Sequence, residues 1–207
     1  MIFRSPRLES LFGCRLDESM PTAAIRQLVD QAAVEAQDLD FKVELYKRDD
    51  VELAKDVAAM ANTHGGVIVL GVREDHEVAV GAPGVELAPS HVQSMRAMVG
   101  SRVRPFPSFE IFAVAGDAPE HGYYVILVAS SAAAPFLVQM GTSDRPTFGY
   151  PRRRGTDTVW LGELEIAAAY RDRSLHVGQQ RERLTQAFQE LACLLRTDTS
   201  WCRLRGL

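Results

Sequence analysis

Glu35, Asp40 and Lys42 are residues of this 207-residue chain whose types and spacing could support chemistry. Two nearby carboxylates can bind Mg²⁺ or Mn²⁺, and the metal would polarise a phosphodiester and lower the pKa of an attacking water. Lys42 would offset the negative charge that develops. Burying a charged side chain beside a packed strand costs free energy, so the presence of these charges favours a functional site over ordinary surface residues. The alternative is that the two acids are exposed and pair with Lys42 and Arg48.

A run of three arginines near residue 150 is the second candidate. Guanidinium groups neutralise phosphates, while a neighbouring tyrosine can stack on a base or pack against a sugar. The alternative is a solvated strand end whose arginines pair with Asp144, Asp157 and Glu163. The candidate nucleic-acid contacts are Arg145, Tyr150, Arg152, Arg153, Arg154 and Thr156.

The segment Asn62, Thr63, His64, Gly65 and Gly66 precedes the apolar run 67–72. Glycine amides can approach a phosphate closely, so a nucleotide cradle is one interpretation. However, these glycines precede a strand rather than a helix, and the chain contains no Gly-x-x-x-x-Gly-Lys-Ser/Thr pattern. The segment therefore predicts a structural turn from helix to strand, built from Asn62, Thr63, Gly65 and Gly66.

Composition limits the function classes. The formal net charge of −4 argues against a protein that coats nucleic acid through bulk charge, so binding would need a local patch. The apolar runs are too short to span a bilayer, and we expect no membrane partner and a cytoplasmic location. The three cysteines form no paired spacing with the five histidines, so neither a disulfide framework nor a zinc site is predicted.

Periodicity predicts an α+β fold, with a mixed or largely antiparallel sheet packed by helices and helical extensions at both ends. We expect an arm over 1–21, a main domain over 22–175, and a helix and tail over 176–207. The predicted helices run from Thr22 toward Glu35, from a cap at Asp49 or Asp50, from Ser90 to about Val103, and over about 162–173 and 178–196. The predicted strands are 39–45, 67–72, a hairpin over 73–80, 109–114, 123–129 and 136–140.

In their order along the chain, these motifs resemble the Schlafen-type AlbA domain, over roughly residues 30 to 175. The resemblance begins with Glu35, a gap of four residues, and Asp40-Phe-Lys42. It continues with Ala61 to Gly66 and with Gly71-Val72 at the end of the next strand. Its last element is an aromatic, arginine and glycine pattern at Tyr150, Arg153, Gly155 and Thr156.

The resemblance implies a mixed α/β fold, nucleic-acid binding and association of domains in pairs, hence a homodimer. In Schlafen members that cut transfer or ribosomal RNA, two leading acids and a third acid beyond the Gly-Val strand form a metal-dependent site. Carried over to this chain, the acids are Glu35, Asp40 and either Glu74 or Asp75, with Mg²⁺ or Mn²⁺ as cofactor. Asp40 stands where the family usually has glutamate.

Three functions follow as hypotheses. The leading one is binding of DNA or RNA through Arg152, Arg153 and Arg154. The second is a metal-dependent endoribonuclease that acts on structured RNA through the acidic residues. The third is a protein-interaction module that uses the helical C-terminus, where Leu184, Phe188, Leu191 and Leu195 form an apolar stripe.

Overall fold

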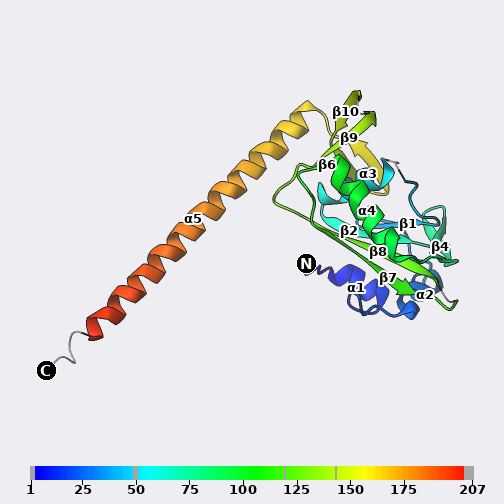
Figure 1. Cartoon of the computed structure of the whole chain (residues 1–207), viewed down its shortest axis with the longest axis horizontal. Coiled ribbons are helices and arrows are strands. Elements are labelled where there is room, and N and C mark those ends of the chain that lie inside the picture. The colour runs from blue at the N-terminus through cyan, green and yellow to red at the C-terminus, as the bar shows by residue number, and fades with distance from the viewer. Residues whose placement is uncertain (1–2, 49–50, 119, 143, 203–207) are drawn as a thin grey trace.

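The structure is a computed structural model that describes residues 3–48, 51–118, 120–142 and 144–202. Its centre is a mixed five-stranded sheet (Figure 1), which confirms the predicted α+β class. β1 runs parallel to β2, while β2, β5 and β7 pair antiparallel with β8. The strands are β1 (Leu39–Lys42), β2 (Gly65–Leu70), β5 (Val85–Glu86), β7 (Phe109–Ala115) and β8 (His121–Ala129).

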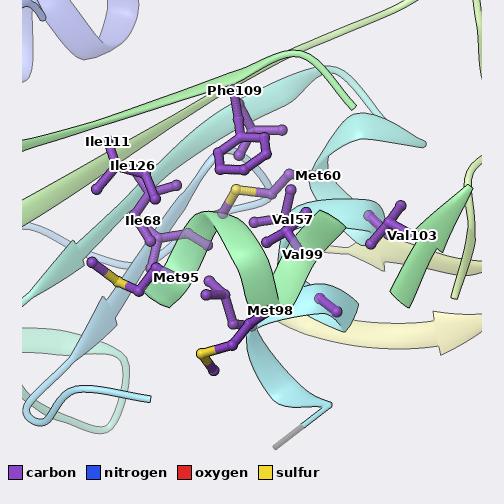
Figure 2. Packing of buried hydrophobic residues seen from close by; sticks show 14 of the residues in the cluster. Val57, Met60, Ile68, Met95, Met98, Val99, Val103, Phe109, Ile111 and Ile126 are labelled. Carbon is purple, nitrogen blue, oxygen red and sulfur yellow. The ribbon is translucent and has the colours of Figure 1, made fainter. Parts of the chain in front are cut away.

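Helices cover both faces of this sheet. All six residues of β2 are buried, as expected of a central strand packed on two sides. Val67 and Val69 face one core together with α1 and α2, whereas Ile68 and Leu70 face a second core with α3 and α4. Figure 2 shows this second core, where Val57, Met60 and Val99 pack over the sheet. The helices are α1 (Pro6–Phe12), α2 (Thr22–Asp30), α3 (Glu52–Ala61) and α4 (Pro89–Arg102).

Three smaller β units surround the central sheet. A three-stranded sheet has the order β10-β9-β6, and two hairpins join β3 to β4 and β11 to β12. Phe136 and Val138 bring the three-stranded sheet into the α3–α4 core. The bounds are β3 (Arg73–Asp75), β4 (Val78–Gly81), β6 (Val103–Arg104), β9 (Leu137–Thr142), β10 (Arg145–Gly149), β11 (Pro151–Arg154) and β12 (Asp157–Trp160).

The structure confirms the helical extensions that the sequence predicted at both ends, but the C-terminal one differs in detail. The N-terminal arm contains α1, which Ser5 caps and whose Leu8 and Phe12 are buried in the core. The predicted break between two C-terminal helices is wrong, because α5 (Glu163–Cys202) is one helix of 40 residues that continues through Gly178. A single interior glycine costs only about 1 kcal/mol, too little to end so long a helix. The predicted caps Asp49 and Asp50 lie outside the described residues.

No helix in the described part of the chain is long and apolar enough to cross a membrane. α5 reaches the necessary length, but charged and polar residues are spread along it. It projects away from the sheet and its covering helices (Figure 1).

The turn after α3 joins several units of the fold. The Asn62 side chain donates to the carbonyls of Phe136 and Pro151 at 2.9 and 2.8 Å, and accepts from the Phe136 amide at 2.6 Å. Thr63 accepts from the Arg153 amide at 3.1 Å. Gly65 then starts β2 with φ of +78°, a conformation that strongly favours glycine. These contacts attach β9 and β11 to the end of α3.

Substitution of Gly65 by alanine should destabilise the fold strongly. A Cβ there would lie 2.5 Å from the Val128 carbonyl oxygen in β8, in addition to the positive φ. We expect a loss of about 2 kcal/mol or more in the free energy of unfolding, measured by urea denaturation. Gly81→Ala is the control, because a Cβ at Gly81 meets nothing within 4 Å. Equal losses for the two variants would contradict this account.

Candidate functional site

Asp40 lies inside the protein rather than on an exposed acidic surface. Leu39 and Phe41 fill the core under α1 and α2, so the alternation of β1 turns Asp40 to the opposite face. Its side chain is 4% exposed, and its Oδ1 accepts from Nη1 of Arg153 at 3.1 Å. Nζ of Lys42 lies 2.5 Å from the other oxygen, Oδ2. Two cations therefore neutralise this buried carboxylate.

Arg153 is the partner that crosses from β11 to β1. Its side chain is 3% exposed and also donates from Nη2 to the Ala36 carbonyl at 3.2 Å. Gln37 donates from Nε2 to the Arg153 carbonyl at 3.3 Å. The sequence analysis predicted Arg153 as a phosphate contact, but in the structure its side chain is almost completely buried. Arg153 therefore positions β11 and does not belong to an exposed patch.

Glu35 and Lys42 flank this pair. Oε1 of Glu35 accepts from the Phe41 amide at 2.6 Å, which holds the carboxylate against the start of β1. Burial, reinforced by the charges of Asp40 and Glu74, raises the pKa of Glu35 despite this hydrogen bond. Burial acts to lower the pKa of Lys42, but the neighbouring acids, first of all Asp40, outweigh it and raise that pKa. Lys42 is thus held in its charged form.

Asp56 is a buried acid that the sequence analysis did not single out. It lies on α3 with 5% exposure and accepts a hydrogen bond from the Tyr46 hydroxyl at 2.8 Å. Burial, and then the charge of Asp40, raise its pKa from 3.8 to about 6. The sequence feature that could have identified Asp56 is its place in α3, where it lies among the apolar residues between Leu53 and Val57. That position indicates a polar group packed toward the interior.

The candidates for a third acid lie in the β3–β4 hairpin. Oε2 of Glu74 accepts from the Glu77 amide at 2.8 Å. The Asp75 side chain is 71% exposed and lies 3.8 Å from the His76 ring. Within the described residues, no group of three His, Cys, Asp or Glu side chains is arranged to hold a metal ion.

The carboxylate oxygens of Asp40 and Glu35 also differ from metal ligands, because protein groups already occupy them. Both oxygens of Asp40 face cationic side chains, and a divalent ion would have to displace Lys42 or Arg153 from them. The fixed oxygen of Glu35 is already bound to a backbone amide. In this arrangement the acids do not fit Mg²⁺ or Mn²⁺, and we assign no metal-dependent step to them.

Arg152 and Arg154 are the exposed members of the arginine run. β11 alternates between buried Pro151 and Arg153 and exposed Arg152 and Arg154. The two exposed arginines therefore share one face of the strand. Together with Gln37, the largely buried Arg153, Gly155, Val159 and Glu165, they line a hollow of about 290 Å³.

The other predicted contacts lie around the β11–β12 hairpin. The Thr156 hydroxyl donates to Oε1 of Glu77 at 2.6 Å, which connects this hairpin to the β3–β4 hairpin. The Tyr150 and Tyr170 hydroxyls lie 3.0 Å apart, and this hydrogen bond raises the pKa of Tyr150 to about 12. Tyr150 thus packs on α5 rather than standing free. Arg145 is exposed on β10.

Asp40 and Lys42 of the first motif thus lie beside Arg153 of the last motif, although more than a hundred residues separate them in the sequence. A family profile described as Schlafen, AlbA_2 matches residues 35–157, more than half of the chain. The chain belongs to the Schlafen AlbA_2 family. The matched segment runs from Glu35, across the buried pair, to Asp157 at the start of β12, and it leaves α1, α2 and α5 outside.

Comparison with solved structures gives a more distant likeness to this Schlafen AlbA_2 chain. The DIP2311 protein from Corynebacterium diphtheriae is 22% identical, with a TM-score of 0.43. The alignment covers 81% of this chain and 29% of that protein, so the chain spans less than a third of its length. A search of curated proteins found no match.

Removal of one partner of the buried pair should destabilise the Schlafen AlbA_2 domain. Asp40→Asn leaves the Arg153 guanidinium buried beside a neutral amide, and breaking such a pair costs about 3 to 5 kcal/mol. Urea denaturation at neutral pH measures the loss. Asp117→Asn is the control, because the Arg26–Asp117 pair is half to four-fifths exposed and should cost less than about 1 kcal/mol. A small loss for Asp40→Asn would show that the pair is not buried in solution.

Asp56 should make stability fall as pH rises. Its folded pKa of about 6 lies above the unfolded value of 3.8, so the folded state holds the proton more tightly. This stabilisation is present at pH 4 and is lost through pH 6, by an amount on the order of 3 kcal/mol. Asp56→Asn should remove this slope from urea denaturation measured across that range. Parallel curves for the variant and the original protein would refute the assignment.

Proposed function

We propose that this protein binds nucleic acid through the sugar-phosphate backbone, with Arg152 and Arg154 as the principal contacts. The observation that carries the proposal is the pattern of β11, in which buried Arg153 turns its two neighbours to the same exposed face. Guanidinium groups are suited to phosphate because their planar donors bind two oxygens at once. Membership in the Schlafen AlbA_2 family supports the same class of ligand.

The surroundings of the arginines favour a local anion site. The hollow beside them contains Gln37 and the exposed Gly155, which leave room for a phosphate group. Arg152 also borders a second hollow of about 340 Å³, to which α5 contributes Arg173 and His176. Asp157 lies opposite Arg154 across the hairpin, and Glu165 borders both hollows, so the positive region is narrow. A narrow basic strip suits a single strand or one backbone of a duplex.

The same geometry favours contacts with phosphate over contacts with bases. Trp160 is 46% exposed but pairs with Pro151, which puts it on the hairpin face opposite Arg152 and Arg154. The Tyr150 hydroxyl is engaged by Tyr170. Contacts to phosphate carry no sequence information by themselves, so we expect salt-dependent binding with weak sequence preference.

The test measures binding of the full chain to labelled single-stranded RNA, single-stranded DNA and duplex DNA by fluorescence anisotropy across a salt series. Arg152→Ala/Arg154→Ala should weaken binding about tenfold or more at low salt. The slope of log affinity against log salt should become shallower by roughly 0.7 to 0.9 for each phosphate that the variant no longer neutralises.

Arg15→Ala/Arg26→Ala is the matched control, because it removes two arginines from the layer of α1 and α2 and should leave binding unchanged. Urea denaturation of both variants checks that the fold is retained. The proposal fails if the protein binds none of the probes, or if the two double variants lose affinity equally.

A further inference from the structure

The first turns of α5 and residues 131–135 border a hollow of about 340 Å³ next to the exposed arginines, here named the α5 hollow. Its volume lies at the lower end of the range of about 300 to 1,000 Å³ that sites for small ligands occupy. Small apolar side chains form its walls and leave space between the helix and the segment before β9. These wall residues are Ala132, Ala134, Pro135, Leu161, Ala168 and Ala169.

One side of α5 supplies polar groups to the α5 hollow. Asp172, Arg173 and His176 line it, one and two turns beyond Ala168 and Ala169 on the same side of the helix. Within the described residues, neither Asp172 nor the half-buried Arg173 forms a hydrogen bond or an ion pair. Withdrawing a charged group from water without a partner costs free energy. Both side chains are therefore available to a ligand.

Arg152 connects the α5 hollow to the proposed phosphate contact. Its side chain borders this hollow and also the hollow of about 290 Å³ that Arg154 lines. A phosphate bound by Arg152 therefore brings its own sugar and base to the α5 hollow. The hollow with both exposed arginines suits a neighbouring phosphate, whereas the apolar walls of the α5 hollow suit the flat faces of a base.

We infer that the α5 hollow binds one nucleoside of a single strand, next to the phosphate held by Arg152. The inference rests on the proposed nucleic-acid contact and adds one position at which a base is recognised. A base in a duplex would have to lose its stacking and pairing to enter, which costs free energy. The α5 hollow therefore favours single strands over duplexes.

The two unpartnered charges select the base. An ionised carboxylate only accepts hydrogen bonds, and it can accept two from adjacent donors. Guanine carries two adjacent donors on its Watson–Crick edge, which Asp172 can bind. On its other edge guanine has two acceptors, O6 and N7, which an arginine such as Arg173 binds in a bidentate way. Guanine is therefore the base that fits both side chains.

Fluorescence anisotropy with the full chain tests this inference. The probe is a short labelled strand of uridines that contains one guanosine, and two comparison strands carry adenosine or inosine at that position. The guanosine strand should bind about fivefold or more tightly than the adenosine strand, which is the lower end of what one good contact to a base edge gives. Inosine lacks only the amino group of guanosine, so its strand should fall between the two.

Two variants of α5 separate the base contact from the phosphate contact. Asp172→Asn should bring the three affinities together, because an amide can both donate and accept. Ala168→Leu should do the same, because a larger side chain fills the α5 hollow. Ala167→Leu is the matched control, since Ala167 is exposed on the same helix and does not line the hollow, and it should keep the preference. Urea denaturation checks that each variant is folded.

Equal affinities for the three strands would overturn the inference, as would a preference that survives either variant, while the contact through Arg152 and Arg154 would stand. Failure of every strand to bind would refute the proposed function and this inference with it. Guanosine monophosphate should bind more than about tenfold more weakly than the strand, because it lacks the neighbouring phosphates. Equally tight binding of the free nucleotide would overturn the assignment to a strand.

Discussion

A buried ion pair between Asp40 of β1 and Arg153 of β11 connects two strands that belong to different sheets. Removing two charges from water costs several kcal/mol for each ion, and good geometry must repay that cost. Here the compensation comes from the hydrogen bonds of Arg153 to Oδ1 of Asp40 and to the Ala36 carbonyl, and from the charge of Lys42 beside Oδ2. Within the described residues, Oδ2 of Asp40 and Nε of Arg153 have no hydrogen-bond partner. The pair fixes the side of β11 that carries Arg153 against Asp40 of β1. With Arg153 inward, the two-residue period of a strand forces Arg152 and Arg154 outward.

The same pair also sets the electrostatics of the neighbouring acids. Glu35 and Asp56 lose solvent and lie near the Asp40 carboxylate, which disfavours their ionised forms. Lys42 and Arg153 are the cations that balance this group, and both are directed at Asp40. A divalent ion would compete with them for the same oxygens. In this chain, Lys42 and Arg153 occupy the positions beside Asp40 that a metal ion would need.

Local periodicity predicted much of the fold. The alternation of Leu39, Asp40, Phe41 and Lys42 and the apolar stripe of α3 are local patterns, and both elements form. However, β1 ends at Lys42 rather than at residue 45, and α3 begins at Glu52. The burial of Arg153 could not be predicted, because three consecutive arginines usually indicate a solvated segment. The compensating carboxylate lies more than a hundred residues earlier. Likewise, burial in the folded protein, and then the charge of Asp40, raise the pKa of Asp56, although the hydrogen bond from Tyr46 acts to lower it. Contacts of this kind depend on topology, which periodicity does not encode.

Asn62 has a consequence for how parts of the molecule move together. Its single amide group binds backbone atoms of Phe136 and Pro151, and the next residue, Thr63, binds the backbone of Arg153. The β9 and β11 units are therefore coupled to the last turn of α3 by side chains rather than by a shared ladder of strand hydrogen bonds. Fraying at the end of α3 would loosen both units at once. The exposed face of Arg152 and Arg154 would then unfold together with the α3–α4 core, because contacts from the end of α3 hold β11 in place.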